Sequence, residues 1–289
     1  MQANVIPAPI GVFDSGVGGL SVLDALAKAL PNERFVYVGD TAHMPYGERT
    51  PDEITRLARG IVQYLIEQHQ AKLLVVACNT SAGILANYWQ KGCPLPVIEP
   101  VEPIAQTLKQ QGRYQRIGLL ATQGTINSGR YQAALRPDIE VVPVVCTGFA
   151  KLVEENQIDT PAGRALLKRF LQPLASHKMV SQENIDAIIF GCTHYPFAKP
   201  VLEAIWQALS QEESLDWLDP AQWMAAAAVA HLEKDNNRPQ DNKADNRQSF
   251  EYFVTGDAAA FDKTANSLGL EYAKLSPAKA INLQLLKTC

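Results

Sequence analysis

Short apolar runs alternate with stretches of helical periodicity along most of the 289-residue chain, and this alternation restricts the fold more than any other feature. A run of four to six apolar residues predicts a buried strand, and a helix between successive strands lets neighbouring strands lie parallel. The runs are residues 10–13, 35–38, 73–77, 117–120, 141–145, 185–190 and 250–254. We therefore predict an α/β fold with mostly parallel sheets.

Two of the predicted strands end in a cysteine. The run at 73–77 leads into Cys78, and the run at 185–190 leads through Gly191 into Cys192. Residues at the carboxyl ends of strands in an open α/β sheet face the crevice where ligands bind. The two thiols are separated by about the length of one domain. We infer that one site is built from both halves of the chain.

The two halves also begin alike. Residues 10–13 read Ile-Gly-Val-Phe and residues 117–120 read Ile-Gly-Leu-Leu, at nearly the offset that separates the two cysteines. This repetition indicates a duplicated unit, and a chain that is 47% hydrophobic can supply two ordinary cores. We interpret the proline-rich segment 99–103 as the crossing into the second domain. Residues 233–249 have nothing to bury and are interpreted as a polar, mobile insertion.

Bulk properties exclude several classes of protein. The net charge is −4, with 26 basic and 30 acidic residues well mixed along the chain, which argues against a nucleic-acid or anionic-membrane surface. No apolar run is long enough to span a bilayer, and residues 1–7 do not resemble a secretory signal. We expect a cytoplasmic protein.

The cysteine count argues against a disulfide framework. Five cysteines are an odd number for a chain of this expected location, and no C-x-x-C or H-x-x-x-H spacing offers a metal site. Three of them are read as small buried apolar residues, namely Cys93, Cys146 and Cys289.

Two loops carry polar groups toward the predicted crevice. The turn at 14–19 reads Asp-Ser-Gly-Val-Gly-Gly; it does not fit the dinucleotide pattern G-x-G-x-x-G, but it presents backbone N–H groups to an anion. A helix predicted over 81–90 places Cys78 near a helix amino terminus, which favours the thiolate. Thr50, Pro51 and Glu53 form a helix-start signal for a helix that runs to about residue 68.

Two thiols on opposite sides of a cleft suit a racemase. One thiolate removes the α-proton of an amino acid, and the other thiol returns a proton on the opposite face, without a pyridoxal cofactor. A thiol redox pair is an alternative, which requires the Cα atoms of Cys78 and Cys192 to approach within about 7 Å. A binding module for an acidic amino acid is a third interpretation.

Four motifs in register resemble the cofactor-independent glutamate racemases, from about residue 8 to residue 270. They are Phe-Asp-Ser-Gly-Val-Gly-Gly-Leu-Ser-Val at 13–22, Pro-Tyr-Gly at 45–47, Ala-Cys-Asn-Thr at 77–80 and Gly-Cys-Thr-His-Tyr-Pro at 191–196. The resemblance implies an isomerase with no cofactor and no metal. Its substrate is L- or D-glutamate, and its product supplies D-glutamate for peptidoglycan in the cell wall.

The resemblance also implies roles for individual residues. Cys78 and Cys192 match the two catalytic thiols, one serving each enantiomer, and Asp14 and His194 match the groups that assist them. The residues implied to hold the substrate are Asp14, Ser15, Pro45, Tyr46, Gly47, Asn79, Thr80, Thr122, Thr125, Thr193 and His194. No role is assigned to Glu99, Glu102 or Glu154.

The implied architecture is two Rossmann-like domains related by pseudo-twofold symmetry, with the active site in the cleft between them. The first domain comprises residues 1–99 plus 215–289, because the carboxy-terminal segment returns to it, and the second comprises 100–214. A homodimer is also consistent with the resemblance. Aspartate racemases remain the alternative, but they usually carry a glutamate where His194 stands and lack the Phe-Asp-Ser-Gly opening.

Overall fold

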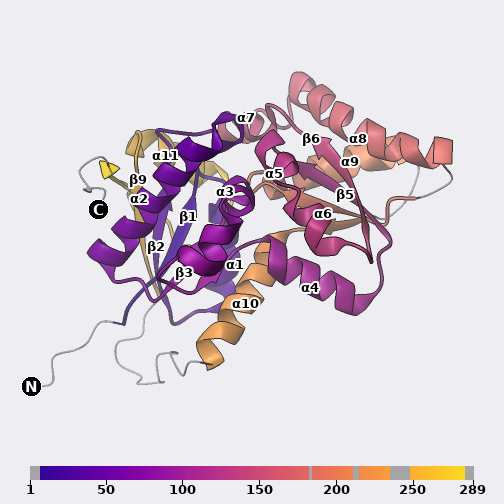
Figure 1. Cartoon of the computed structure of the whole chain (residues 1–289). Helices are drawn as coiled ribbons and strands as arrows, with labels where there is room; N and C mark the ends of the chain where they lie inside the picture. Colours follow the sequence, from indigo (N-terminus) through magenta and orange to yellow (C-terminus); the bar gives the residue numbers. More distant parts are fainter. Residues whose placement is uncertain (1–6, 182–183, 211–214, 235–247, 284–289) are drawn as a thin grey trace, which may run out of the picture.

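Strands and helices alternate throughout the protein, which is described by a computed structural model over residues 7–181, 184–210, 215–234 and 248–283 (Figure 1). The strands are β1 (Ile10–Asp14), β2 (Arg34–Gly39), β3 (Leu73–Val76), β4 (Val97–Ile98), β5 (Arg116–Ala121), β6 (Glu140–Val145), β7 (Ala187–Gly191), β8 (Asp216–Leu218), β9 (Ser249–Val254) and β10 (Lys279–Ala280). Most of the predicted polar insertion, residues 235–247, lies outside the described residues.

The described strands form two sheets in which every pairing is parallel. The first has the order β10-β9-β2-β1-β3-β4 and the second has the order β6-β5-β7-β8. The predicted α/β fold with two parallel sheets is confirmed.

The two sheets repeat one arrangement. The order β2-β1-β3-β4 in the first sheet corresponds strand by strand to β6-β5-β7-β8 in the second. The repeated Ile-Gly openings fall on β1 and β5, which occupy equivalent places between two parallel neighbours. Cys78 follows β3 and Cys192 follows β7, so the two thiols stand at equivalent strand ends.

Helices cover both faces of each sheet. The long helices are α1 (Leu20–Ala29), α2 (Pro51–His69), α4 (Val101–Gln111), α8 (Pro161–Ser181), α9 (Lys199–Ser210), α10 (Pro220–Lys234) and α11 (Ala258–Ser267). Alternate side chains of the first sheet pack against α1 and α10 on one face and against α2 on the other. The second sheet is buried in the same way between α8 and α9 on one face and α4 on the other. Burial on both faces explains the continuous apolar runs in the sequence.

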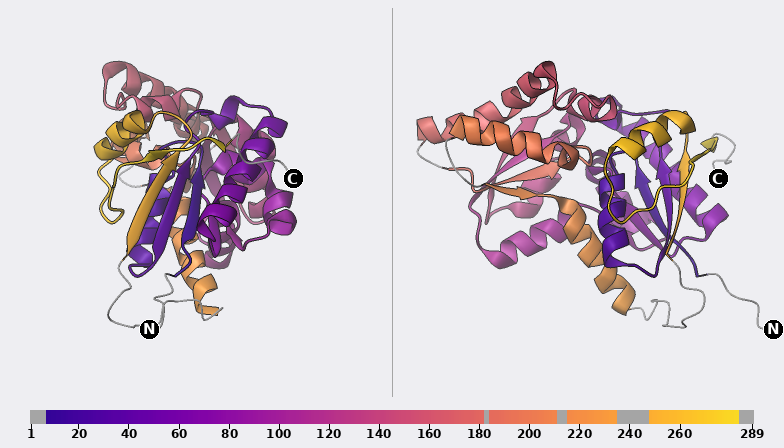
Figure 2. Two further views of the ribbon diagram at one scale, coloured as in Figure 1. Left: turned by 90° about the vertical axis from the view of Figure 1, so that its left-hand side faces the viewer. Right: turned by 180° about the vertical axis from the view of Figure 1, so that it is seen from behind.

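The carboxy-terminal part of the chain returns to the first sheet. Strand β9 pairs with β2, and Figure 2 shows it beside the amino-terminal strands. Strand β8, by contrast, pairs with β7 in the second sheet. The predicted boundary at residue 215 is therefore too early with respect to strand pairing. We propose the division 7–98 plus 219–283 and 99–218; helix α10 packs against both α1 and α4 where the two parts meet.

One predicted helix start is confirmed in detail. The Thr50 side chain accepts from the backbone N–H of Glu53, the Glu53 carboxylate accepts from the backbone N–H of Thr50, and Pro51 opens α2. These bonds satisfy backbone donors that have no partner within the helix.

The passage between the two sheets contains a helix start. Segment 99–103, predicted as the crossing into the second domain, follows β4 of the first sheet, and α4 begins within it at Val101. Pro103 falls in the first turn of α4, where proline is tolerated. The Glu99 carboxylate accepts from the N–H groups of Val101 and Glu102 and so caps the helix.

One local prediction was wrong. The helix predicted over 81–90 is broken, since α3 spans only Asn79–Ile84 and a π-helical turn follows at Tyr88–Gly92.

Candidate active site

The polar residues that follow β1, β3, β5 and β7 meet across the boundary between the two sheets. Thr193 Oγ1 donates to Asp14 Oδ1 over 3.2 Å, and Ser21 Oγ donates to the Thr193 carbonyl over 3.1 Å. Thr80 Oγ1 lies 2.9 Å from Thr122 Oγ1. Side chains from both halves, distant in sequence, are thus brought into one place.

Cys192 belongs to a chain of three polar groups. Its Sγ lies 3.7 Å from Nδ1 of His194, and Nε2 of His194 lies 2.6 Å from a carboxylate oxygen of Glu154. Burial disfavours the imidazolium, but the hydrogen bonds to Cys192 and Glu154 and the negative charge of both outweigh burial. The pKa of His194 is held well above its usual range. His194 therefore presents a positive charge to the Cys192 sulfur.

Cys78 has a different environment. Its thiol donates to Ser15 Oγ over 3.7 Å, and the side chain is 4% exposed. Burial, followed by the negative charge of Asp14, raises the pKa of Cys78 to about 12. The amino terminus of α3 acts in the predicted direction, because a hydrogen bond from the Ser81 N–H lowers the pKa of Cys78. Desolvation outweighs this effect, so the net shift is opposite to the predicted one and the group is a thiol at neutral pH.

Asp14 lies fully buried at the end of β1. Burial raises its pKa to about 6, although the positive charge of His194 and hydrogen bonds from Gly16 and Thr193 lower it. The carboxylate accepts from the Gly16 N–H over 2.9 Å and from Thr193. It is mostly ionised at neutral pH and able to take up a proton near pH 6, which suits a group that exchanges protons with a neighbour.

Three threonine hydroxyls form a cluster that joins the halves. Thr80 stands on α3; Thr122 is the N-cap of α5 (Gln123–Ser128), and Thr125 lies in its first turn. The oxygens of Thr122 and Thr125 are 3.0 Å apart, and Thr80 lies within 3.4 Å of Thr125. The three residues implied by the resemblance are therefore in contact with one another. Each hydroxyl can donate or accept, so the cluster can adapt to a carboxylate or an ammonium group.

The Pro-Tyr-Gly segment at 45–47 lies beside the site with its glycine, while its tyrosine hydroxyl is bound elsewhere. The Tyr46 hydroxyl donates to the buried Asp40 carboxylate over 2.6 Å, and this bond ties it to the first sheet. Gly47 lies against Thr122, because an added Cβ would stand 2.9 Å from the Thr122 Cβ. Pro45 is exposed beside them. The Tyr46 ring thus fixes the loop, and its hydroxyl is engaged by Asp40.

Asn79 and Thr193 are buried at the strand ends next to the thiols, with exposed fractions of 5% and 7%. Asn79 and Thr80 are the first two residues of α3, so their backbone N–H groups have no partner within the helix. All four described cysteines, which include both site thiols, are free thiols.

Glu154 is the residue that sequence reasoning missed. It stands at the end of α7 (Phe149–Glu154), and only packing of this helix against the end of β7 brings it to His194. No local motif marks it, and neighbouring Glu155 is exposed and pairs with Lys151. The other site residues were predicted because they directly follow a strand. Glu154 does not follow a strand, so this criterion could not find it.

Within the described ranges, none of the helices combines the length and apolarity needed to cross a lipid bilayer. The same part of the chain has no group of three or more His, Cys, Asp or Glu side chains arranged to hold a metal ion.

Two parallel sheets that repeat one strand order define the class of α/β protein to which the chain belongs, and comparisons with known proteins identify the family. Residues 10–228 match the family described as Asp/Glu/Hydantoin racemase. The chain belongs to this family and is an isomerase of the racemase type.

Individual relatives cover most of the chain. Glutamate racemase from Levilactobacillus brevis is 36% identical over 261 residues, which are 89% of this chain and 90% of the relative. The structure is similar to glutamate racemase from Thermus thermophilus in complex with β-chloro-D-alanine, with a TM-score of 0.80, 33% identity and coverage of 96% and 98% of the two chains. Glutamate racemase from Francisella tularensis in complex with D-glutamate gives a TM-score of 0.80 at 27% identity, with coverage of 95% and 97%.

Proposed function

We propose that the protein interconverts L- and D-glutamate and that Cys78 and Cys192 are its two proton-transfer groups. The carrying observation is that the two thiols stand at equivalent strand ends of the two sheets and each has its own polar partners. A packing role alone does not account for two thiols related by the internal repeat. The names of the relatives support glutamate as the substrate.

The reaction needs one base and one acid on opposite faces of the α-carbon. In one direction the Cys192 thiolate takes the α-proton, and the electron pair of the broken C–H bond remains on the substrate as a carbanion. The Cys78 thiol then delivers its proton to the other face, which inverts the centre and leaves Cys78 as thiolate. The opposite enantiomer is processed by the reverse transfer.

The charges beside the two thiols fit the first of these directions. His194, whose pKa is raised, places a positive charge beside Cys192, whereas burial raises the pKa of Cys78 and keeps it protonated. A bound amino acid would bring its ammonium group to this buried region. Positive charge there would favour both the Asp14 carboxylate and a Cys78 thiolate, which the reverse direction requires.

Groups that can hold the amino acid line the same place. We propose that the backbone donors at Asn79 and Thr80 and the hydroxyls of Thr80, Thr122 and Thr193 bind the carboxylates. Backbone and hydroxyl donors can replace an arginine in this task, because several of them share one carboxylate. The proposed binding set is Asp14, Ser15, Pro45, Tyr46, Gly47, Asn79, Thr80, Thr122, Thr125, Thr193 and His194.

We further propose that the D-glutamate produced serves peptidoglycan synthesis in the cytoplasm, as the family resemblance implies. A homodimer stays a prediction, which light scattering on the purified protein tests directly.

Proton NMR in D2O tests the activity. We expect L-glutamate to lose its α-proton signal and D-glutamate to form, in protein free of pyridoxal phosphate and metal. Exchange with aspartate but not with glutamate would keep the mechanism and overturn the substrate assignment. Binding of glutamate without any α-proton exchange would favour a binding protein instead.

Replacing Gly18 with alanine should disable the site while the fold is retained. A Cβ on Gly18 would stand 2.4 Å from both His194 Nδ1 and Thr193 Oγ1, so both side chains must move. Displacements near 1 Å cost about a hundredfold in rate, and we expect racemisation to fall by that amount. Steady-state kinetics and a thermal melt measure the two effects.

Gly60→Ala is the matched control, since a Cβ at Gly60 in α2 meets nothing within 4 Å. We expect normal activity and a slightly higher melting temperature, because alanine is the better helix residue. Unchanged turnover in Gly18→Ala would show that the approach of Gly18 to His194 does not position the site.

A further inference from the structure

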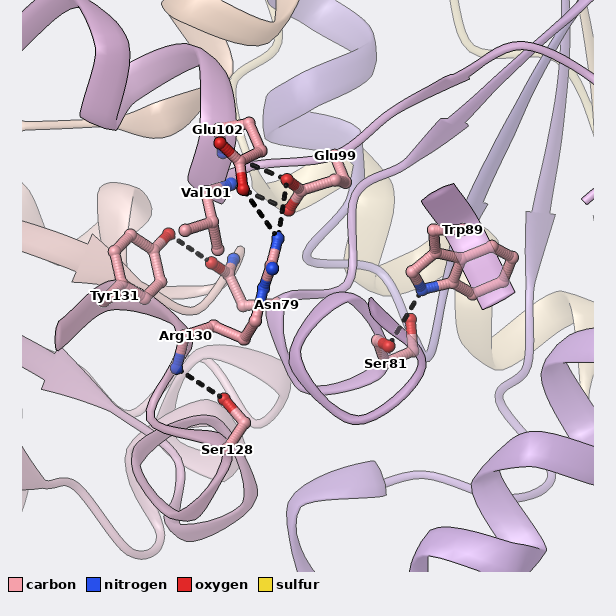
Figure 3. A network of polar contacts seen from close by, with 9 residues as sticks. All are labelled: Asn79, Ser81, Trp89, Glu99, Val101, Glu102, Ser128, Arg130 and Tyr131. Carbon is pink, nitrogen blue, oxygen red and sulfur yellow. Dashed lines mark hydrogen bonds and ion pairs between the residues drawn. The ribbon is translucent and has the colours of Figure 1, made fainter. Parts of the chain in front are cut away.

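One direct contact links the residue beside Cys78 to the second half of the protein. The Tyr131 hydroxyl donates to the side-chain oxygen of Asn79 over 2.6 Å (Figure 3). Tyr131 lies on α6 (Arg130–Leu135) and is 1% exposed; Asn79 immediately follows Cys78. Burial raises the pKa of Tyr131 well above its usual value, so the hydroxyl stays protonated.

The contact determines how the Asn79 amide is oriented. With Oδ1 directed to Tyr131, the NH2 group points the other way, and within the described part of the chain it makes no hydrogen bond. A buried amide has two donors and one carbonyl, and a fixed hydroxyl that donates to the carbonyl selects one of its two orientations. The donor end is thereby left for a ligand that accepts hydrogen bonds.

The ion pairs of the neighbouring residue, Arg130, help to hold Tyr131 in place. Arg130 Nη2 lies 3.1 Å from the Glu102 carboxylate and 3.5 Å from that of Glu99, and Glu99 also caps α4 (Figure 3). These carboxylates stand where the chain passes from the first sheet to the second. The Arg130–Glu99 pair is partly buried, with side chains 20% and 8% exposed, which limits screening by solvent, whereas Glu102 is 44% exposed.

The α3 helix is also packed closely against the same part of the second half. An added Cβ on Gly83 would stand 2.4 Å from Ser128 Oγ, and Ser128 in turn accepts from the Arg130 N–H over 3.4 Å. Helix α3 therefore meets the second half both at its first residue and near its end. The position of α6 relative to α3 is defined by packing as well as by the Tyr131 bond.

We propose that Tyr131 is a positioning residue that holds the Asn79 amide with its NH2 group toward a carboxylate of the bound amino acid. The inference rests on the proposed function in that it takes glutamate as the ligand. Tyr131 itself touches no reacting atom; it acts through Asn79. The amide would otherwise be free to turn its oxygen toward the carboxylate, which would repel it.

Tyr131→Phe tests this role, because it removes the hydroxyl and keeps the buried ring. We expect the KM and the calorimetric Kd for glutamate to rise about tenfold, the effect of one lost hydrogen bond near 1.4 kcal/mol, with kcat changed less. In an Asn79→Ala background the same substitution should change Kd less than about twofold, because residues that act as a unit are not additive.

Tyr114→Phe is the matched control. Tyr114 is also buried in the second half. Its hydroxyl donates over 2.9 Å to the carboxylate of Asp216, which belongs to β8. We expect this variant to lower stability without changing Kd. A purely structural role for Tyr131 would give the same result, a lower melting temperature with wild-type Kd, and would overturn the proposal.

The binding measurement separates this proposal from the racemase assignment. If wild-type protein binds glutamate without exchanging its α-proton, the assignment falls, while a weaker Kd in Tyr131→Phe still supports the positioning role. If the wild type racemises glutamate and Tyr131→Phe matches it in Kd and KM, only the positioning role falls. If the wild type does not bind glutamate at all, both fall.

Discussion

Replacing either Cys78 or Cys192 with serine is expected to abolish racemisation and to leave one-sided proton exchange. A serine hydroxyl is a far weaker acid than a thiol and cannot serve as the base at neutral pH. General acid–base groups contribute about 10²- to 10⁴-fold, and we expect racemisation to fall by at least that amount. Each variant keeps one thiol, which can remove and return the proton on a single face.

The exchange should therefore select opposite enantiomers in the two variants. Proton NMR in D2O, started separately from L- and D-glutamate, measures loss of the α-proton without inversion. Cys93→Ser is the control, because Cys93 is a half-buried free thiol outside the site. Racemisation within about tenfold of wild type in either site variant would contradict the two-thiol mechanism.

Replacing His194 with asparagine should lower kcat about a hundredfold in the direction that uses Cys192 as base and less in the other. The two KM values must change along with kcat, because an equilibrium constant of one keeps kcat/KM equal for the two enantiomers. The reason is that asparagine keeps a polar side chain but carries no positive charge beside the Cys192 sulfur, 3.7 Å away in the native site. Kinetics measured separately from each enantiomer give this asymmetry. Equal losses in both directions would show that His194 acts on the substrate and not on Cys192.

The role of His194 also predicts how kcat/KM depends on pH: it should fall at alkaline pH, where the imidazolium loses its proton. Hydrogen bonds to Cys192 and Glu154 raise the pKa of His194, so the imidazolium should persist through neutral pH and be lost only as pH rises through the raised value. Glu154→Gln removes part of that stabilisation and should move the alkaline fall in kcat/KM to lower pH. Glu155→Gln is the control, because Glu155 is exposed and faces Lys151. An alkaline limb unchanged by Glu154→Gln would contradict this account.

The two thiols are unequal despite the internal repeat. Cys192 faces a cation that is held by a carboxylate, whereas Cys78 faces a hydroxyl and the negative charge of Asp14. The sheets repeat one strand order, but the helices and loops around the thiols have diverged. The directional predictions above follow from this asymmetry.

Residue patterns along the chain were enough to predict the sheets and the position of the thiols. Apolar runs separated by helical segments require parallel strands buried on both faces, and Cys78 and Cys192 directly follow two of those strands. The start of α2 could also be predicted, because Thr50, Pro51 and Glu53 lie within one helical turn. Such features depend on residues that are close in the chain, so their pattern is visible in the sequence.

The groups that act on the thiols are brought to them by long-range packing of the folded chain. Glu154 reaches His194 from the far end of another helix, and Tyr131 reaches Asn79 from the other half of the protein. The net direction of the Cys78 pKa shift was missed, because a helix amino terminus is visible in the sequence whereas the larger effect, the loss of solvent around the thiol, is not. Desolvation and long-range contacts depend on how the two sheets are packed together, and no local pattern of residues encodes that packing.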